Sequence, residues 1–171
     1  MTGPTHVAGG ILAASLLIPT LDTSEPTAVL VTVAALGALL PDIDLPGSLV
    51  SKMLGPIAML YNWIEAKVMP AGMQHRGFTH TLLCLCLMAV WVLWGSDPER
   101  DVWVVNYYAL MLTAGVASHI ALDMLTVSGV PLLWPLLGKF RFRVGFIHTG
   151  SAVEEAIHNL IWAVIVVDTL I

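Results

Sequence analysis

Histidine and aspartate recur along this chain in short motifs that could bind a divalent metal ion. The motifs are Thr5-His6, Leu40-Pro41-Asp42-Ile43-Asp44, His75-Arg76-Gly77-Phe78-Thr79-His80 and Ser118-His119-Ile120-Ala121-Leu122-Asp123. Imidazole and carboxylate groups are the ligands that zinc, manganese and iron accept in proteins. His119 and Asp123 are four residues apart, so on a helix both side chains point the same way. The same spacing joins Glu154 to His158.

Each motif has a simpler interpretation when it is taken alone. His6 could be a polar residue at a membrane interface, and the pair Asp42 and Asp44 could end a helix. Glu154 and Glu155 could be charges that complement a helix dipole. The occurrence of all the motifs in one chain favours a metal site, and leaves open which of the two aspartates binds the ion.

The composition indicates that lipid solvates part of the chain. Of the 171 residues, 57% are hydrophobic and 11% are charged, with a mean hydropathy of +0.85. Soluble domains carry roughly 25% charged residues, so this chain has too few charges to cover a water-soluble surface. Only seven residues are Lys or Arg, and this argues against direct nucleic-acid binding.

Apolar segments predict an all-α, polytopic membrane helix bundle that forms a single domain over residues 1–171. About five transmembrane helices are expected, at residues 7–21, 27–41, 81–95, 103–122 and 154–171. Lipid cannot satisfy free backbone groups, so every span must be helical. Small residues in two of the spans, such as Gly37 and Gly115, would let helices approach closely. Apolar stretches in the two long connections, Met53–Tyr61 and Val130–Leu137, are expected to lie in the membrane interface or re-enter it.

Positive charges predict the orientation of the bundle. Six of the seven Lys and Arg residues fall in the long connections 42–80 and 124–153, which five alternating spans place on one side. Positive loops face the cytoplasm, so we expect a multi-pass membrane protein with both long connections and its N-terminus on the cytoplasmic side. The His and Asp motifs fall at the helix ends on this same face.

These motifs resemble those of the YdjM-type family, described as LexA-binding, inner-membrane-associated putative metal-dependent hydrolases. The similarity extends over most of residues 5–143. Beyond the motifs above, it includes Asp123-Met124-Leu125-Thr126, Gly129-Val130-Pro131-Leu132-Leu133-Trp134-Pro135 and Arg141-Phe142-Arg143. The resemblance implies a metal-dependent hydrolase in the inner membrane, with a soluble protein partner at its cytoplasmic face as a further expectation.

The order of the motifs is also similar to that of zinc-dependent phospholipase C and related single-strand nucleases. This likeness implies one or two divalent metal ions, with zinc expected and manganese or iron as alternatives. The implied metal ligands are His6, Asp42, His80, His119, Asp123 and Glu154, with Asp44 and His75 as alternatives to Asp42 and His80. Asp123 would bridge two ions.

The combined pattern predicts hydrolysis of a lipid phosphoester at the cytoplasmic membrane face. Arg76, Asp44 and His75 are the expected catalytic residues, and Arg76 would neutralise developing oxyanion charge. Ser118, Thr79 and Thr126 are expected to orient the ligands. The alternative is a regulatory or interaction protein whose metal is structural. Ion transport is disfavoured because the polar groups cluster at one end of the spans.

Overall fold

The computed structural model describes residues 1–69, 75–94 and 106–170. Within these ranges it contains α-helices and short 3-10 turns and no β-strand, which confirms the all-α prediction. The α-helices are α1 Gly3–Leu17, α2 Thr27–Gly37, α3 Leu49–Leu54, α4 Pro56–Val68, α5 Leu82–Trp94, α6 Tyr107–Met124 and α7 Ala152–Leu170. Each of the five predicted spans overlaps one α-helix, although residues 95, 103–105 and 171 lie outside the described ranges.

Local sequence explains where several helices begin. The Asn106 side chain accepts a hydrogen bond from the Ala109 amide (3.0 Å) and caps α6, as Asn commonly does at this position. Ser48 caps α3 in the same way, through the Ser51 amide. Gly55, at φ +46°, provides the turn between α3 and α4, a conformation that costs glycine little.

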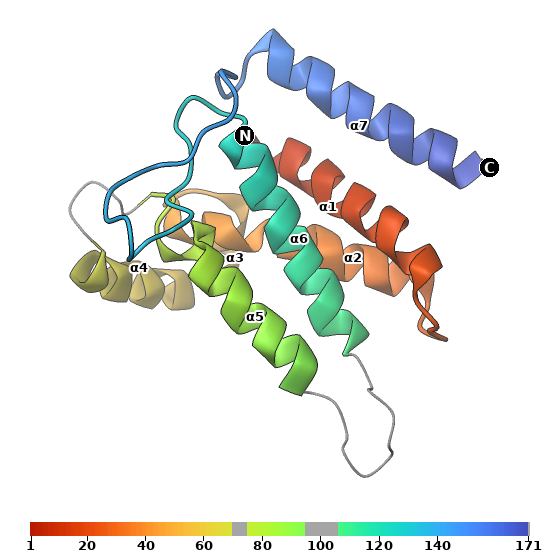
Figure 1. The fold of residues 1–171 in the computed structure, drawn as a ribbon, viewed down its shortest axis with the longest axis horizontal. Helices are drawn as coiled ribbons and strands as arrows, with labels where there is room; N and C mark the ends of the chain where they lie inside the picture. Colours follow the sequence, from red (N-terminus) through yellow and green to blue (C-terminus); the bar gives the residue numbers. More distant parts are fainter. Residues whose placement is uncertain (70–74, 95–105, 171) are drawn as a thin grey trace.

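Helices α1, α2 and α6 form the packed centre of the molecule (Figure 1). Here α2 and α6 approach so closely that side chains are excluded from the contact. A Cβ atom on Gly115 would lie 2.1 Å from the Ala34 carbonyl oxygen, and one on Gly37 would lie 2.3 Å from that of Leu112. The expectation that small residues allow close helix approach is therefore confirmed. This contact fixes the C-terminal ends of α2 and α6, which carry the aspartates and His119.

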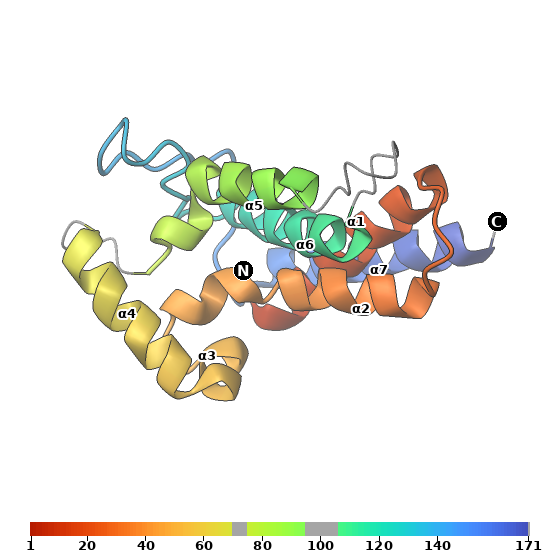
Figure 2. The ribbon, with the colours of Figure 1, turned by 90° about the horizontal axis from the view of Figure 1, so that it is seen from below.

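Two long connections gather at one end of this bundle. The short helices α3 and α4 extend away from α1, α2 and α6 at that end (Figure 2). The segment from residue 125 to residue 151 folds back over the start of α5, where the Leu82 amide donates to the Leu132 carbonyl (2.7 Å). Single β-bridges join Thr126 to Ile147 and Val130 to Phe142.

The fold exposes more apolar surface than a water-soluble protein needs. Charged and polar side chains are buried at one end of the bundle, whereas large apolar side chains of α4, α5 and α7 are exposed. Among the described residues, one segment, Thr27–Asp44, is long and apolar enough to cross a membrane. The α5 residues 82–93 are also apolar but form a shorter helix.

Candidate metal centre

Four histidine and aspartate motifs meet at the end of the bundle where α1 begins and α6 ends. His6 comes from the first turns of α1, Asp42 and Asp44 from the 3-10 turn Leu40–Asp44 that extends α2. The other members are His80, which ends the 3-10 turn Phe78–His80, and His119 and Asp123 on α6. His6, His80 and His119 are fully buried, and Asp44 and Asp123 are nearly so.

Two groups of three residues have ligand atoms close enough to share a metal ion. One group is His6, Asp42 and His119, and the other is His80, His119 and Asp123; within each, the ligand atoms lie within 4.8 Å of one another. His119 belongs to both groups. The predicted ligands His6, Asp42, His80, His119 and Asp123 are thus brought together.

The buried histidines are held so that free nitrogen atoms face this centre. His119 donates through Nδ1 to the Ala38 carbonyl oxygen (2.7 Å), and His80 Nδ1 lies 3.3 Å from Asp44 Oδ2. Their Nε2 atoms are then left 3.1 Å apart, both 3.7 Å from Asp123 Oδ2. Two imidazoles that share one zinc ion at Zn–N distances of about 2.0–2.1 Å have nitrogens roughly 3.0–3.4 Å apart. The spacing therefore fits a shared cation.

His6 provides a second sign that a ligand belongs here. Its ring stacks on that of His119, with centroids 3.6 Å apart and planes inclined by 12°. Both of its nitrogens are buried without a hydrogen-bond partner, and Nε2 lies 3.4 Å from Asp123 Oδ1. A buried polar atom without a partner normally costs free energy. A cation bound at this point would be a partner for a nitrogen of His6 that no protein atom contacts by a hydrogen bond. The Met1 amino group also contacts Asp123 Oδ1.

Asp44 supports the centre and belongs to neither group of three. Its carboxylate accepts hydrogen bonds from the Gly77 amide (3.0 Å) and the Thr79 hydroxyl (3.2 Å). It also lies beside Nδ1 of both His75 and His80. A carboxylate that contacts the far nitrogen of a ligating histidine fixes the orientation of the ring. Asp44 is thus placed to orient His80, and His75 lies at the surface with half of its side chain exposed.

Arg76 is buried within the protein and its guanidinium is already paired. Its Nε lies 2.7 Å from Asp123 Oδ2. Its Nη1 donates to the Thr126 hydroxyl (2.7 Å) and the Gly129 carbonyl (3.2 Å). Arg76 has φ +60°, a conformation uncommon outside glycine that costs of order 1–3 kcal/mol. The contacts connect the His75–His80 segment to the end of α6, and Thr126 takes part in this connection.

Glu154 lies apart from both groups of ligands. Its Oε1 accepts from the Thr2 hydroxyl (2.8 Å) and the Thr2 amide, and Oε2 accepts from the Gly150 amide (2.7 Å). These bonds connect the start of α7 to the start of α1. With His158, Glu154 lines a separate hollow of about 200 Å³. Ser118 bonds to the Gly115 carbonyl of its own helix.

The inward face of α4 holds polar residues that motif reasoning missed. Asn62 donates to the Ile43 carbonyl (3.0 Å), between the two aspartates. Glu65 accepts from the Phe78 amide (2.9 Å) and the Tyr61 hydroxyl (2.9 Å). Burial, followed by the negative charge of Asp44, raises the pKa of the Glu65 carboxyl to about 7. The available signal was one acidic residue within an otherwise apolar stretch.

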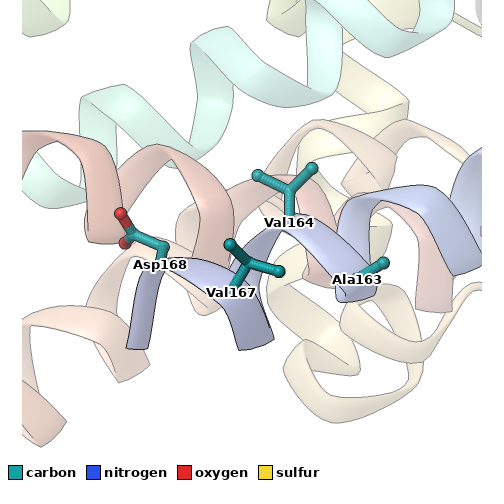
Figure 3. Close-up of a pocket in the computed structure, with 4 residues that line it drawn as sticks. All are labelled: Ala163, Val164, Val167 and Asp168. Carbon is teal, nitrogen blue, oxygen red and sulfur yellow. The ribbon is translucent and has the colours of Figure 1, made fainter. Parts of the chain in front are cut away.

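Other hollows differ in character from this centre. One, of about 510 Å³, lies on the C-terminal half of α7 and is lined by Ala163, Val164, Val167 and Asp168 (Figure 3). Apart from one carboxylate its lining is apolar, so it has no set of metal ligands. Another, of about 520 Å³, is lined by arginine and phenylalanine side chains of the segment 125–151.

Together, the fold and the site define an all-helical protein with a buried histidine and aspartate cluster at one end. The family model for the YdjM inner membrane protein matches residues 1–170. The chain therefore belongs to the YdjM inner membrane protein family, which confirms the resemblance and supports the predicted inner-membrane location.

The chain also matches individual proteins. The chain is 40% identical over 126 residues to the inner membrane protein YdjM of Escherichia coli (strain K12), and likewise to that of Shigella flexneri. Each match covers 72% of this chain and 58% of the relative, so the chain spans little more than half the length of these proteins. It is 31% identical over 157 residues to "Uncharacterized protein YvsG" of Bacillus subtilis (strain 168), covering 92% and 87% of the two chains. No solved structure matches.

Proposed function

We propose that this chain is a multi-pass inner-membrane metalloenzyme that hydrolyses a lipid phosphoester at the cytoplasmic membrane face. The observation that carries the proposal is the convergence of His80 Nε2 and His119 Nε2, 3.1 Å apart, beside two carboxylates in a buried centre. His119 would belong to the ligand set of every ion held there. Zinc is the first choice of metal because imidazole and carboxylate suit it, and manganese and iron accept the same ligands.

A bound ion at this centre would activate water for hydrolysis, since a catalytic metal lowers the pKa of its water from 15.7 to about 7. The residues of the chain would hold and orient the reacting groups. Asp42 is the most open of the proposed ligands, with 15% of its side chain exposed, so substrate would approach past this residue. Asp123 would stay ionised because the positive charge of Arg76 stabilises its carboxylate.

Lipid is the proposed substrate because apolar surface surrounds the centre. α5 and α7 expose large apolar side chains along their length, as helices that contact lipid do. With α1, α2 and α6 they would form about five transmembrane helices. The positive connections that flank the centre would face the cytoplasm. A lipid substrate could then reach the site from the side, within the bilayer.

A second candidate function is a membrane interaction protein in which the metal is structural. It is favoured by the burial of the ligands, since structural sites are closed and catalytic sites keep an open position. Under this proposal a soluble protein would bind at the cytoplasmic face, and the metal would stabilise the surface that receives it.

Elemental mass spectrometry followed by a hydrolysis assay tests these proposals. Protein purified in maltoside detergent without chelator is expected to contain one or two equivalents of metal. His119→Ala should lose it and His148→Ala, in an exposed loop residue, should retain it. Phosphorus NMR of phosphatidic acid and phosphatidylglycerol micelles would then detect cleavage. Bound metal without cleavage of either lipid would favour the interaction protein, and absence of metal would overturn both candidates.

A further inference from the structure

An arginine-lined hollow lies beside the metal centre, on the segment that follows α6. Its lining residues are Val127, Ser128, Phe140, Arg141, Phe142 and Arg143, and its volume is about 520 Å³. The Val127–Ser128 side and the Phe140–Arg143 side are held together by the antiparallel bridge of Val130 with Phe142. In that bridge the Phe142 amide donates to the Val130 carbonyl (2.8 Å). The hollow is thus built by two chain segments in a fixed register.

The hollow is positively charged and has no carboxylate in its lining. Arg143 forms no ion pair or hydrogen bond with any residue in the described ranges. Arg141 donates from Nη2 to the His75 carbonyl (3.1 Å), which leaves its other N–H groups available. Burial and the nearby charge of Arg76 lower the pKa of Arg141, although an arginine stays protonated in proteins. Asp44, outside the lining, acts electrostatically on Arg141, whereas the charge of Arg143 has no acidic partner in the described ranges, and this charge favours an anionic ligand.

The donors fit a phosphate group. Two guanidinium groups and the Ser128 hydroxyl could together donate several charge-assisted hydrogen bonds, and arginine recognises phosphate through paired N–H groups. The His75 carbonyl contact places Arg141 next to the segment that supplies His80 to the metal centre. An anion in the hollow would therefore lie beside that centre.

The surroundings of the hollow favour a phosphate carried by a lipid. Phe140 is 56% exposed, and Leu136 and Phe146, nearby along the chain, are 84% and 83% exposed. A segment with such side chains would cost free energy in water and would be stable at the acyl boundary of a membrane. Arginine heads with apolar neighbours are suited to the level of lipid headgroups.

We propose that Arg141, Arg143 and Ser128 form a subsite for the phosphate of an anionic lipid headgroup. The subsite deepens the proposed function, because it names how the substrate would be held, and it rests on that function for its role in catalysis. Binding itself requires no turnover, so the two proposals can fail separately.

Isothermal titration of the purified chain in maltoside detergent tests the subsite. The probes are dihexanoyl phosphatidic acid, inorganic phosphate and dihexanoylglycerol. Dihexanoyl phosphatidic acid is expected to bind, and Arg141→Gln and Arg143→Gln should each weaken binding roughly tenfold or more. Lys139→Gln is the matched control, because it removes one positive charge from the same segment but not from the hollow. It should change the affinity less than about twofold. Arg143→Gln also guards against misfolding, because this side chain has no hydrogen bond or ion pair to lose in the described ranges.

Several results would overturn the subsite. Binding of dihexanoyl phosphatidic acid that both arginine variants retain would do so, as would an equal loss in Lys139→Gln. Equal affinity for inorganic phosphate would assign the hollow to the free ion, and equal affinity for dihexanoylglycerol would show that phosphate is not recognised. The same titration with His119→Ala, the variant expected to lose metal, shows whether lipid binding in the hollow depends on the metal centre. Arginine-dependent binding without any hydrolysis by the wild type would leave the subsite standing and the enzyme proposal refuted.

Discussion

Arg76 and Asp123 form a buried ion pair, with Nε 2.7 Å from Oδ2, between two motifs that are 47 positions apart in the sequence. The sequence motif predicts that this guanidinium stabilises charge on a substrate, yet in the structure it contacts a proposed metal ligand and Thr126. Its position indicates that it neutralises and aligns Asp123. A direct role of Arg76 toward substrate remains a prediction. A substrate would have to compete with Asp123 and Thr126 for the N–H groups of Arg76.

Arg76→Ala should destabilise the protein strongly because it leaves the Asp123 carboxylate buried without its partner. Breaking a buried ion pair in this way costs about 3–5 kcal/mol. The measurement is the unfolding temperature in detergent, with Lys139→Ala as the exposed control. The double variant Arg76→Ala/Asp123→Asn should recover part of the loss, because no uncompensated charge stays buried. An unfolding temperature like that of the wild type would contradict this account.

Asp44→Asn should weaken metal binding without abolishing it. Asp44 contacts Nδ1 of His80, and loss of such an orienting carboxylate typically lowers metal affinity 10–100-fold. His80→Ala, which removes a proposed ligand, should have a larger effect. Competition with a fluorescent zinc chelator measures both affinities. Complete loss of metal from Asp44→Asn in a folded protein would instead make Asp44 a ligand.

Glu65 should make the protein less stable as the pH rises from about 4.5 to about 7. Its pKa is raised from 4.5 to about 7 in the folded protein, so the folded state holds a proton that the unfolded state releases. The stabilisation is complete below the unfolded pKa and is lost as the pH passes the folded value. Unfolding temperatures across this range should decline in the wild type and decline less in Glu65→Gln. Parallel curves would contradict the raised pKa.

Gly115→Leu should disrupt the packing of α2 against α6 and displace the ends that carry the metal ligands. Even a Cβ at this position would lie 2.1 Å from a backbone oxygen of α2, so the helices must separate. The expected result is a lower unfolding temperature together with reduced metal content. Ala121→Leu, on the exposed face of the same helix, should change neither. Normal metal content in Gly115→Leu would show that the centre tolerates this separation.

The outer face of α4 should lie in lipid. Ile57, Leu60, Trp63, Ile64 and Val68 are exposed on this helix, whereas Glu65 is buried. The exposed charges of α3 and α4, Lys52 and Lys67, are both positive, as suits an anionic membrane surface.

Spin labels at Leu60→Cys and Ile64→Cys, in a Cys84→Ser/Cys86→Ser background, should be accessible to oxygen and protected from a polar nickel reagent. The experiment uses nanodiscs with 30% phosphatidylglycerol. A label at Thr149→Cys, in an exposed loop, is the comparison, and nickel accessibility at Leu60 equal to that at Thr149 would place α4 in water.

Much of the fold was predictable because apolar segments form helices wherever they are buried or in lipid. Each predicted span overlaps a helix, and the glycines at positions 37 and 115 pack as expected. The candidate ligands were recognisable because few residue types bind metals and they fell in compact motifs. Helix count across the membrane and orientation stay predictions, since hydropathy alone does not position a bilayer.

By itself, the sequence determined the helical class, the family and the set of histidines and aspartates that could bind metal. Only the tertiary structure decided which of these residues contact one another and which of them lie apart from the metal centre. In the structure, His80 and His119 point toward each other. Asp44 lies beside His80, and Arg76 forms an ion pair with Asp123. It also placed Glu154 among Thr2 and Gly150. The physical reason is that residue type and spacing fix which groups are available, whereas their partners depend on how distant segments pack.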